Sequence, residues 1–253
     1  MTHAPEPTYE EIGMCYAFTF FKDVEKANIP LLDVPRMIDL VQYPPRSGIM
    51  GIISKIITDQ NVNLDDFREN VMFLLTEQNE DELIQMLSVV KGRTSLLEIG
   101  SRFGGTLARM AGVLAQNSRI VSVDHPMGDK DPYPHHPKQC LERTAERLRS
   151  AGHQCTLIDA DSQSADTVEK VRTLGPFDFG FIDADHSYEG VKKDWENYAP
   201  LCKVMGFHDI AGDDLGCVRF WNEIKGNYTH QEFISTNGKR KLGIGIIFHD
   251  GAT

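Results

Sequence analysis

From Ser95 onward the chain alternates short apolar runs with amphipathic stretches, and this alternation restricts the possible folds more than any other feature of the sequence. Short apolar runs bounded by turn residues are typical of buried strands, and apolar residues at helical spacing are typical of helices that cover a sheet. Repeated strand–helix units predict an α/β fold with a doubly wound, mostly parallel sheet. The expected strands are residues 95–99, 119–123, 155–158, 177–182 and 207–210, and the expected helices are residues 107–114, 139–150, 166–174 and 188–198.

The first expected strand ends in a glycine-rich turn. Glu98, Gly100 and Gly104 form the pattern E-x-G-x-x-x-G, which differs from the G-x-G-x-x-G of dinucleotide-binding folds. Glycine lets the backbone turn sharply and approach a ligand, and the helix that follows offers free amide donors. Glycine also ends strands for structural reasons alone, but the acid before Gly100 favours a ligand site. Because ligands bind beyond the carboxyl ends of parallel strands, this turn is the first candidate site.

Polar residues also follow the second and third expected strands. Asp124 closes the second strand roughly 20 residues after the glycine turn, the spacing at which an acid reaches ribose hydroxyls. The alternative is a helix cap or a solvated strand end, and the nearby glycine turn favours the ribose role. After the third strand, Asp161 and Ser162 could accept a hydrogen bond from an adenine amino group or simply cap the next helix. The residues alone favour neither role.

The most distinctive cluster follows the fourth expected strand. Asp183, Asp185 and His186 crowd the end of an apolar run, and His208 and Asp209 lie in the fifth expected strand. Ionisable groups in such a place cost desolvation free energy unless they bind a cation or transfer protons. Together, carboxylates and an imidazole from two neighbouring strand ends could hold a divalent ion. Taken singly, each residue is better explained as a helix cap, an exposed histidine or part of a local ion pair.

These motifs resemble those of the class I S-adenosylmethionine-dependent methyltransferases. The similarity rests on LLEIGSRFGGTLARMA, VSVDHP, FDFGFIDADHSYEGVKKDWENYAPLCK and FHDI, within residues 76–248, and it includes residues 242–245, which resemble the family's last strand. Inside this class, the chain is most similar to the macrocin-type O-methyltransferases and the cephalosporin hydroxylase-like proteins. The resemblance implies a Rossmann-like methyltransferase fold and a site for S-adenosylmethionine. The residues implied at that site are Glu98, Gly100, Ser101 and Gly104 around the methionine part, Asp124 at the ribose, Asp161 and Ser162 at the adenine, and Asp183.

The resemblance further implies a metal-assisted reaction. Asp183, His208 and Asp209 would bind a divalent ion, Mg²⁺, and Asp183 and His186 would be the catalytic residues, with His186 as general base. A histidine of unperturbed pKa is suited to take a proton, and a metal ion would lower the pKa of the acceptor hydroxyl. Two departures from the family pattern weaken this expectation. The segment 201–207 is shorter than in the family, so the strand leading to His208 is truncated or the turn before it is rebuilt, and His208 replaces an acid.

The expected activity is in-line transfer of the sulfonium methyl group to a hydroxyl of a small molecule, such as a sugar or a natural product. Two alternatives remain: a metal-independent small-molecule methyltransferase, and a non-catalytic cofactor-binding subunit of the cephalosporin hydroxylase-like type. A Rossmann dehydrogenase is a more distant alternative because G-x-G-x-x-G is missing. Residues 126–137 are too long for a tight connection and are expected to form a lid or an acceptor wall.

The composition limits the partners and the compartment. A formal net charge of −11 argues against a nucleic-acid partner, because phosphate binding needs clustered Lys and Arg. No apolar run is long enough to cross a membrane, and the N-terminus lacks the features of a signal peptide. The five cysteines are scattered without a C-x-x-C pair, which is typical of reduced thiols. We therefore expect a cytoplasmic enzyme without a membrane or nucleic-acid partner.

The first part of the chain differs from the rest. Residues 1–75 show helical patterns and turn residues but no strand-like alternation. We therefore expect an N-terminal helical extension over residues 1–75, acting as a lid or an oligomer contact, before a catalytic domain of residues 76–253. An apolar helical extension is compatible with a homo-oligomer. Residues 80–87 begin with acids and continue with an apolar face, which predicts a helix.

Overall fold

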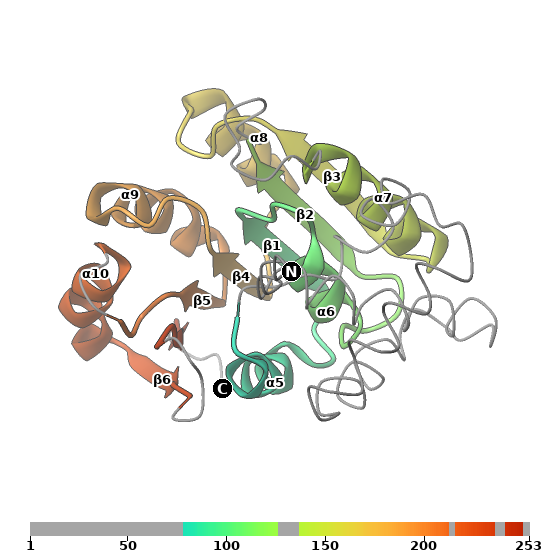
Figure 1. Ribbon diagram of the computed structural model, residues 1–253. Helices are drawn as coiled ribbons and strands as arrows, with labels where there is room; N and C mark the ends of the chain where they lie inside the picture. Colours follow the sequence, from blue (N-terminus) through green and yellow to red (C-terminus); the bar gives the residue numbers. More distant parts are fainter. Residues whose placement is uncertain (1–77, 126–136, 213–215, 236–240, 250–253) are drawn as a thin grey trace, which may run out of the picture.

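A seven-stranded sheet organises the part of the chain that the computed structural model describes, residues 78–125, 137–212, 216–235 and 241–249 (Figure 1). The expected N-terminal extension and all but the last residue of the expected lid lie outside these residues. The strands are β1 (Ser95–Ile99), β2 (Arg119–Asp124), β3 (Gln154–Asp159), β4 (Phe179–Ile182), β5 (Val204–His208), β6 (Thr229–Phe233) and β7 (Ile244–Phe248). Their order across the sheet is β3-β2-β1-β4-β5-β7-β6. Neighbours from β3 to β5 pair in parallel, and β7 runs antiparallel to both β5 and β6, which confirms the expected mostly parallel sheet.

Helices cover both faces of the sheet (Figure 1). The bounds are α5 (Glu80–Val90), α6 (Gly105–Ala111), α7 (Pro137–Ser150), α8 (Ala165–Leu174), α9 (Tyr188–Tyr198) and α10 (Gly216–Ile224). Apolar residues of α5, α6 and α7 share one buried cluster with one side of the strands. Apolar residues of α8, α9 and α10 share the other cluster with the opposite side. The sheet is therefore doubly wound, as expected.

The central strands are buried on both sides, which explains why their sequences are mostly apolar. In β1, Leu96 packs on the face that α5 to α7 cover, and its neighbour Leu97 packs on the face that α8 to α10 cover. In β2, Ile120 and Val121 divide in the same way. Adjacent residues of a strand point to opposite faces, so each strand contributes to both cores.

One strand was not expected from the sequence. β6 forms the edge of the sheet, and its first four residues, Thr229 to Glu232, are exposed. It pairs with β7 through backbone hydrogen bonds, and nothing in its polar sequence marks it as a strand. The last strand, β7, begins at Ile244, whereas the family resemblance suggested a strand from Leu242 to Gly245.

The short segment before His208 contains a turn, a bridge to the start of β4 and the strand β5. A 3₁₀ turn, Ala199–Leu201, follows α9 directly, and Cys202 forms a parallel bridge with Phe177 beside the start of β4. The chain then enters β5, which is fully buried and pairs with both β4 and β7. β5 therefore ends at His208, and Asp209 and Ile210, which were expected within this strand, lie beyond it.

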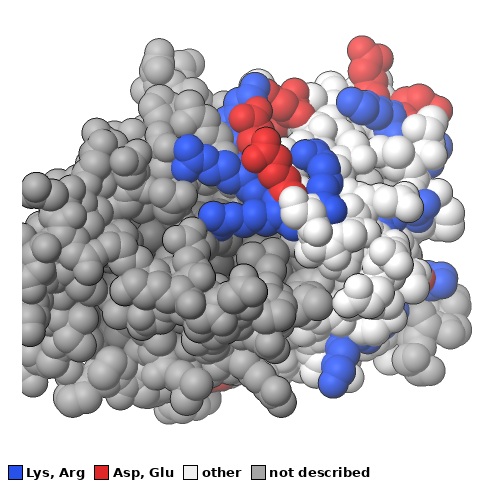
Figure 2. Space-filling model, turned by 90° about the vertical axis from the view of Figure 1, so that its right-hand side faces the viewer, with Lys and Arg blue, Asp and Glu red and all other residues white. Residues whose placement is uncertain are grey.

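The surface of the described part is polar. None of its helices is both long enough and apolar enough to span a membrane. On the side that lies to the right in Figure 1, Lys and Arg side chains lie next to Asp and Glu side chains in the upper part of the face (Figure 2). Helix α7 carries Lys138, Arg143, Arg147 and Arg149 interleaved with two glutamates, so its outer side is a solvated surface of mixed charge.

Candidate active site

The carboxyl ends of β1, β2, β4 and β5 meet at one edge of the sheet, because these four strands are neighbours and run in the same direction. The glycine turn follows β1, and Asp124 is the last residue of β2. Asp183 follows β4, and His208 is the last residue of β5. The strand-end rule thus brings residues from distant parts of the sequence to one place.

The glycine turn is held by a buried hydrogen-bond network. Glu98 is completely buried, and its carboxylate accepts a hydrogen bond from the Ser101 hydroxyl, which also lies 2.7 Å from the hydroxyl of Ser122. Burial raises the pKa of Glu98 well above its ordinary value, although the Ser101 hydroxyl counteracts this. Gly104, with φ of 87°, is the N-cap of α6. The turn therefore leads into a helix N-terminus, the kind of backbone that offers free amide donors.

Gly100 places the glycine turn directly against the end of β4. Its φ of 89° lies in the left-handed region that glycine tolerates best. A Cβ at this position would lie 2.3 Å from the carbonyl oxygen of Asp183, so no side chain fits. The backbone of the turn and that of Asp183 are therefore in close contact.

Asp124 is tied to the same turn. Its carboxylate accepts a hydrogen bond of 2.6 Å from the backbone N–H of Arg102. Burial raises the pKa of Asp124, and the backbone donors Arg102 and Ser101 counteract this. The structure shows that the carboxylate lies beside the glycine turn, and the ribose contact remains a prediction.

Asp161 and Ser162 each have a hydrogen-bond partner within the protein. The exposed Asp161 carboxylate accepts a hydrogen bond of 2.8 Å from the backbone N–H of Gln163, which forms a local turn. The Ser162 hydroxyl donates to Asp194 on α9, at 2.8 Å. The adenine contact of these two residues stays a prediction, and both side chains have structural partners of their own.

Four ionisable residues converge after β4 and β5, and we call Asp183, His186, His208 and Asp209 the His–Asp cluster. Asp183 Oδ1 lies 3.0 Å from His208 Nδ1 and 3.4 Å from His186 Nε2. Asp209 Oδ2 lies 3.0 Å from His186 Nδ1, and Asp209 Oδ1 lies 3.6 Å from His208 Nδ1. The His186 ring thus lies between two carboxylates. Its side chain is 39% exposed, whereas that of His208 is 3% exposed, so His186 is the member that solvent or a substrate can reach.

The carboxylates govern the charge of the two rings. Hydrogen bonds to Asp183 and Asp209 raise the pKa of His186 to about 10. Burial lowers the pKa of His208, but the charge and hydrogen bond of Asp183, together with the charge of Asp209, outweigh this and raise it overall. Burial raises the pKa of Asp183, and the two histidines outweigh that effect and lower it. At neutral pH the His186 ring therefore holds a proton, whereas the sequence analysis assumed an unperturbed ring.

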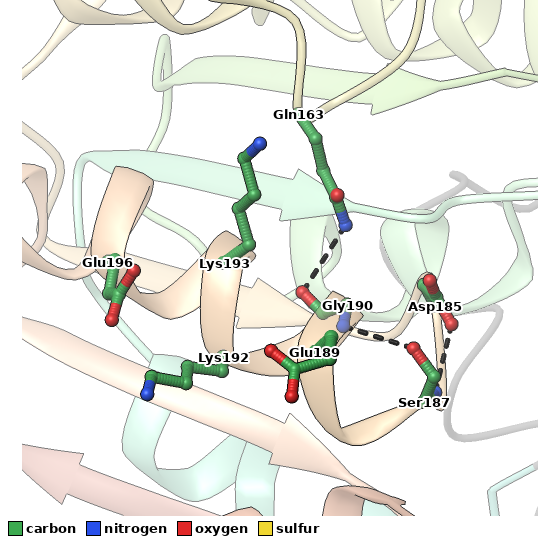
Figure 3. A pocket seen from close by; sticks show the side chains of 8 residues that line it. All are labelled: Gln163, Asp185, Ser187, Glu189, Gly190, Lys192, Lys193 and Glu196. Atoms are coloured by element: carbon green, nitrogen blue, oxygen red, sulfur yellow. Dashed lines mark hydrogen bonds between the residues drawn. The ribbon is translucent and has the colours of Figure 1, made fainter.

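A surface hollow adjoins the cluster on the side of α9. It has a volume of about 390 Å³ and is lined by Gln163, Asp185, Ser187, Glu189, Gly190, Lys192, Lys193 and Glu196 (Figure 3). The Ser187 hydroxyl accepts a hydrogen bond from the backbone N–H of Gly190 at 3.0 Å and so caps α9. The Gln163 amide reaches across to the carbonyl of Gly190, at 3.3 Å. Basic and acidic side chains share the lining, and no member of the His–Asp cluster belongs to it.

Residues 97–214 match the family model of a methyltransferase domain. Over this segment, which includes the glycine turn and the His–Asp cluster, the chain is similar to methyltransferase domains. This result confirms the enzyme class that the glycine turn and the stretch after β4 indicated. The narrower similarity to the macrocin-type and cephalosporin hydroxylase-like groups stays a prediction.

Solved structures share the fold of the methyltransferase domain. An O-methyltransferase from Bacillus cereus, solved in complex with SAH, is 16% identical with a TM-score of 0.54, over 85% of this chain and 97% of its own. The O-methyltransferase TomG from Streptomyces achromogenes, in complex with SAM, is 18% identical with a TM-score of 0.52, over 70% of this chain and 82% of its own. The cofactor-bound Rv0187 from MTB is 16% identical with a TM-score of 0.55, over 82% of this chain and 98% of its own. A search among curated proteins by sequence finds no match.

One neighbour of the His–Asp cluster could not be singled out from the sequence. Gln78 lies just before α5, and its Nε2 donates a hydrogen bond of 2.7 Å to Asp183 Oδ2. No motif surrounds Gln78, and the contact joins residues 105 positions apart. Only the tertiary structure reveals it.

Asp194 supplies a test of the electrostatics behind this site. Burial raises its pKa to about 6, and the Ser162 hydroxyl counteracts part of the shift. Because the folded pKa exceeds the unfolded one, the protonated carboxyl stabilises the fold below the unfolded pKa, and this stability is lost as the pH rises through about 6. We expect Asp194→Asn to gain thermal stability relative to wild type between about pH 4 and about pH 7, measured as the difference in Tm. The exposed Asp81→Asn is the control, and a pH-independent difference for Asp194→Asn would contradict the assignment.

Proposed function

We propose that the chain binds S-adenosylmethionine at the glycine turn and transfers its methyl group to a hydroxyl of a small molecule, such as a sugar or a natural product. The observation that carries this proposal is the contact between Gly100 and the backbone of Asp183. This contact places the turn expected to bind the cofactor beside the His–Asp cluster, whose ionisable side chains could accept a proton. The fold, which the chain shares with enzymes solved with SAM or SAH, supports the same cofactor.

The cofactor supplies an activated methyl group, so the protein has to bind, orient and accept a proton. The glycine turn and the start of α6 would bind the methionine part, and Asp124 would bind the ribose. When the bond from the acceptor oxygen to the methyl carbon forms and the carbon–sulfur bond breaks, the hydroxyl loses its proton. His186, the exposed member of the His–Asp cluster, would receive that proton once its ring is neutral.

Metal assistance is a separate question within this proposal. Asp183, His208 and Asp209 lie close together, but Asp183 Oδ1 and Asp209 Oδ2 face histidine rings and Asp183 Oδ2 accepts from Gln78. Within the described residues, no three histidine, cysteine, aspartate or glutamate side chains are arranged to hold a metal ion. Mg²⁺ also prefers oxygen ligands to imidazole. This arrangement does not fit Mg²⁺, so we assign no step to a metal, and the metal-independent methyltransferase becomes the better supported form of the proposal.

Calorimetric titration with S-adenosylmethionine tests the proposal. We expect binding that EDTA leaves unchanged, and release of S-adenosylhomocysteine when a panel of sugars and phenols is added, followed by mass spectrometry. Absence of cofactor binding would overturn the proposal. Binding without turnover of any acceptor would favour the non-catalytic subunit, and turnover that EDTA abolishes and Mg²⁺ restores would favour metal assistance.

A further inference from the structure

A buried chain of hydrogen bonds links the glycine-turn helix to the His–Asp cluster. The Thr106 hydroxyl donates to Gln78 Oε1 at 2.6 Å, and Gln78 Nε2 donates to Asp183 Oδ2 at 2.7 Å. Gln78 and Thr106 are each 8% exposed. Buried hydrogen bonds of this kind have little competition from water, so they restrict the side chains that they join. We call these three residues the Gln78 bridge.

The Gln78 bridge crosses between the two halves of the proposed site. Thr106 is in the first turn of α6, directly after the glycine turn. Asp183 follows β4 and contributes its other oxygen, Oδ1, to both histidines of the His–Asp cluster. Gln78 precedes α5 and belongs to neither half, so it contacts both from a third element.

The partners of Gln78 fix the direction of its amide. An ionised carboxylate only accepts hydrogen bonds, so it must face the amide nitrogen, and the amide oxygen is left for the Thr106 hydroxyl. The same contact fixes the Asp183 carboxylate. Because Oδ2 is held by Gln78, Oδ1 is the oxygen turned toward His208 and His186. Without the amide, the carboxylate could rotate about its last side-chain bond and leave the histidines.

We propose that Gln78 is a positioning residue of the methyltransferase site: it orients Asp183 for His186 and His208, and Thr106 orients Gln78. This inference rests on the proposed function only for its effect on turnover. The effect on the geometry of the His–Asp cluster follows from the contacts themselves and can be measured without cofactor or acceptor.

The test is nuclear magnetic resonance of the imidazole nitrogens in the full chain, labelled with ¹⁵N-histidine. The chain has nine histidines, and the variants His186→Gln and His208→Gln assign the two signals of interest. We expect Gln78→Leu to change the ¹⁵N shifts of both rings, because Asp183 is released. Thr106→Val should give a smaller change in the same direction, whereas Thr106→Ser, which keeps the hydroxyl, should resemble wild type. Gln85→Leu is the matched control, since Gln85 is an exposed glutamine on α5 that donates to the carbonyl of Asp81.

Unchanged ring signals in a folded Gln78→Leu variant would overturn the inference. If Gln78→Leu does not fold, the comparison of Thr106→Val with Thr106→Ser tests the inference instead. Equal histidine ¹⁵N spectra for these two variants would overturn the inference as well. Titration of the same variants with S-adenosylmethionine keeps the two proposals apart. If wild type does not bind S-adenosylmethionine, the proposed function alone is wrong. If the ¹⁵N shifts of both rings do not change in the variants, the inference alone is wrong. Once an acceptor is identified, kcat of Gln78→Leu should fall roughly tenfold to a hundredfold, because a catalytic group is misplaced. The cofactor affinity of this variant should stay near that of wild type.

Discussion

The His186→Ala variant is expected to lose turnover by roughly a hundredfold or more while its affinity for S-adenosylmethionine stays near wild type. His186 is the most exposed member of the His–Asp cluster, and its ring is fixed by a carboxylate on each side. Removal of the ring takes away the proton acceptor but leaves the glycine turn and Asp124 in place. Steady-state kinetics combined with calorimetric titration measures the two quantities separately. The control is His230→Ala, an exposed histidine on the edge strand β6.

The pH dependence of the wild-type enzyme sharpens this prediction. A base works in its deprotonated form, and the pKa of His186 is raised to about 10. If His186 accepts the proton, kcat/KM of the free enzyme should keep rising with pH well above the ordinary histidine pKa of about 6.5. A kcat/KM that stays constant from neutral pH upward would contradict this role. The base would then be a group that is already ionised at neutral pH, such as a carboxylate of the cluster. Lost cofactor affinity with unchanged turnover at saturation would likewise show that His186 is not the base.

The Asp124→Ala variant is expected to weaken cofactor binding by roughly tenfold to a hundredfold, the equivalent of about 1.5–3 kcal/mol for a hydrogen bond to a charged group. Two effects add: the ribose loses its acceptor, and the backbone N–H of Arg102 loses the carboxylate that holds the glycine turn. Turnover at saturating cofactor should change much less than the affinity.

The neighbouring strand offers a matched control for Asp124. Asp159 is the last residue of β3, directly opposite Asp124 in the sheet, and its exposed carboxylate pairs with Lys138. Asp159→Ala should therefore leave cofactor affinity near wild type. An equal loss of affinity in both variants would show that the effect is one of general charge at this edge, and the ribose role of Asp124 would be wrong.

The sequence predicted those parts of the fold that are buried on both sides. β1, β2 and β4 are mostly apolar because each face of the sheet is covered by helices, and such runs can be identified without any tertiary information. β6 could not be predicted because an exposed edge strand needs no apolar residues, and its strand character comes from pairing with β7. Strands that are buried on both faces can therefore be predicted from the sequence, whereas this exposed edge strand could not.

The same distinction holds for the site. The convergence of Asp183, His208 and Asp209 was predictable, since each follows or ends a parallel strand and such ends meet at one edge. The charge of His186 was not, because it depends on two carboxylates whose distances only the folded chain sets. Gln78 was equally hidden, because nothing in its own neighbourhood in the sequence points to Asp183.

The polar edge strand β6 has a consequence for how the protein behaves at high concentration. Among the described residues, β6 pairs with β7 alone, so its other side presents backbone groups that could pair with a strand of another molecule. A long apolar edge strand favours aggregation, and charged or polar side chains on an edge strand oppose it. His230, Gln231 and Glu232 are exposed along this edge. The polar residues that made β6 hard to predict from the sequence thus also oppose the pairing of this edge with a strand of a second copy.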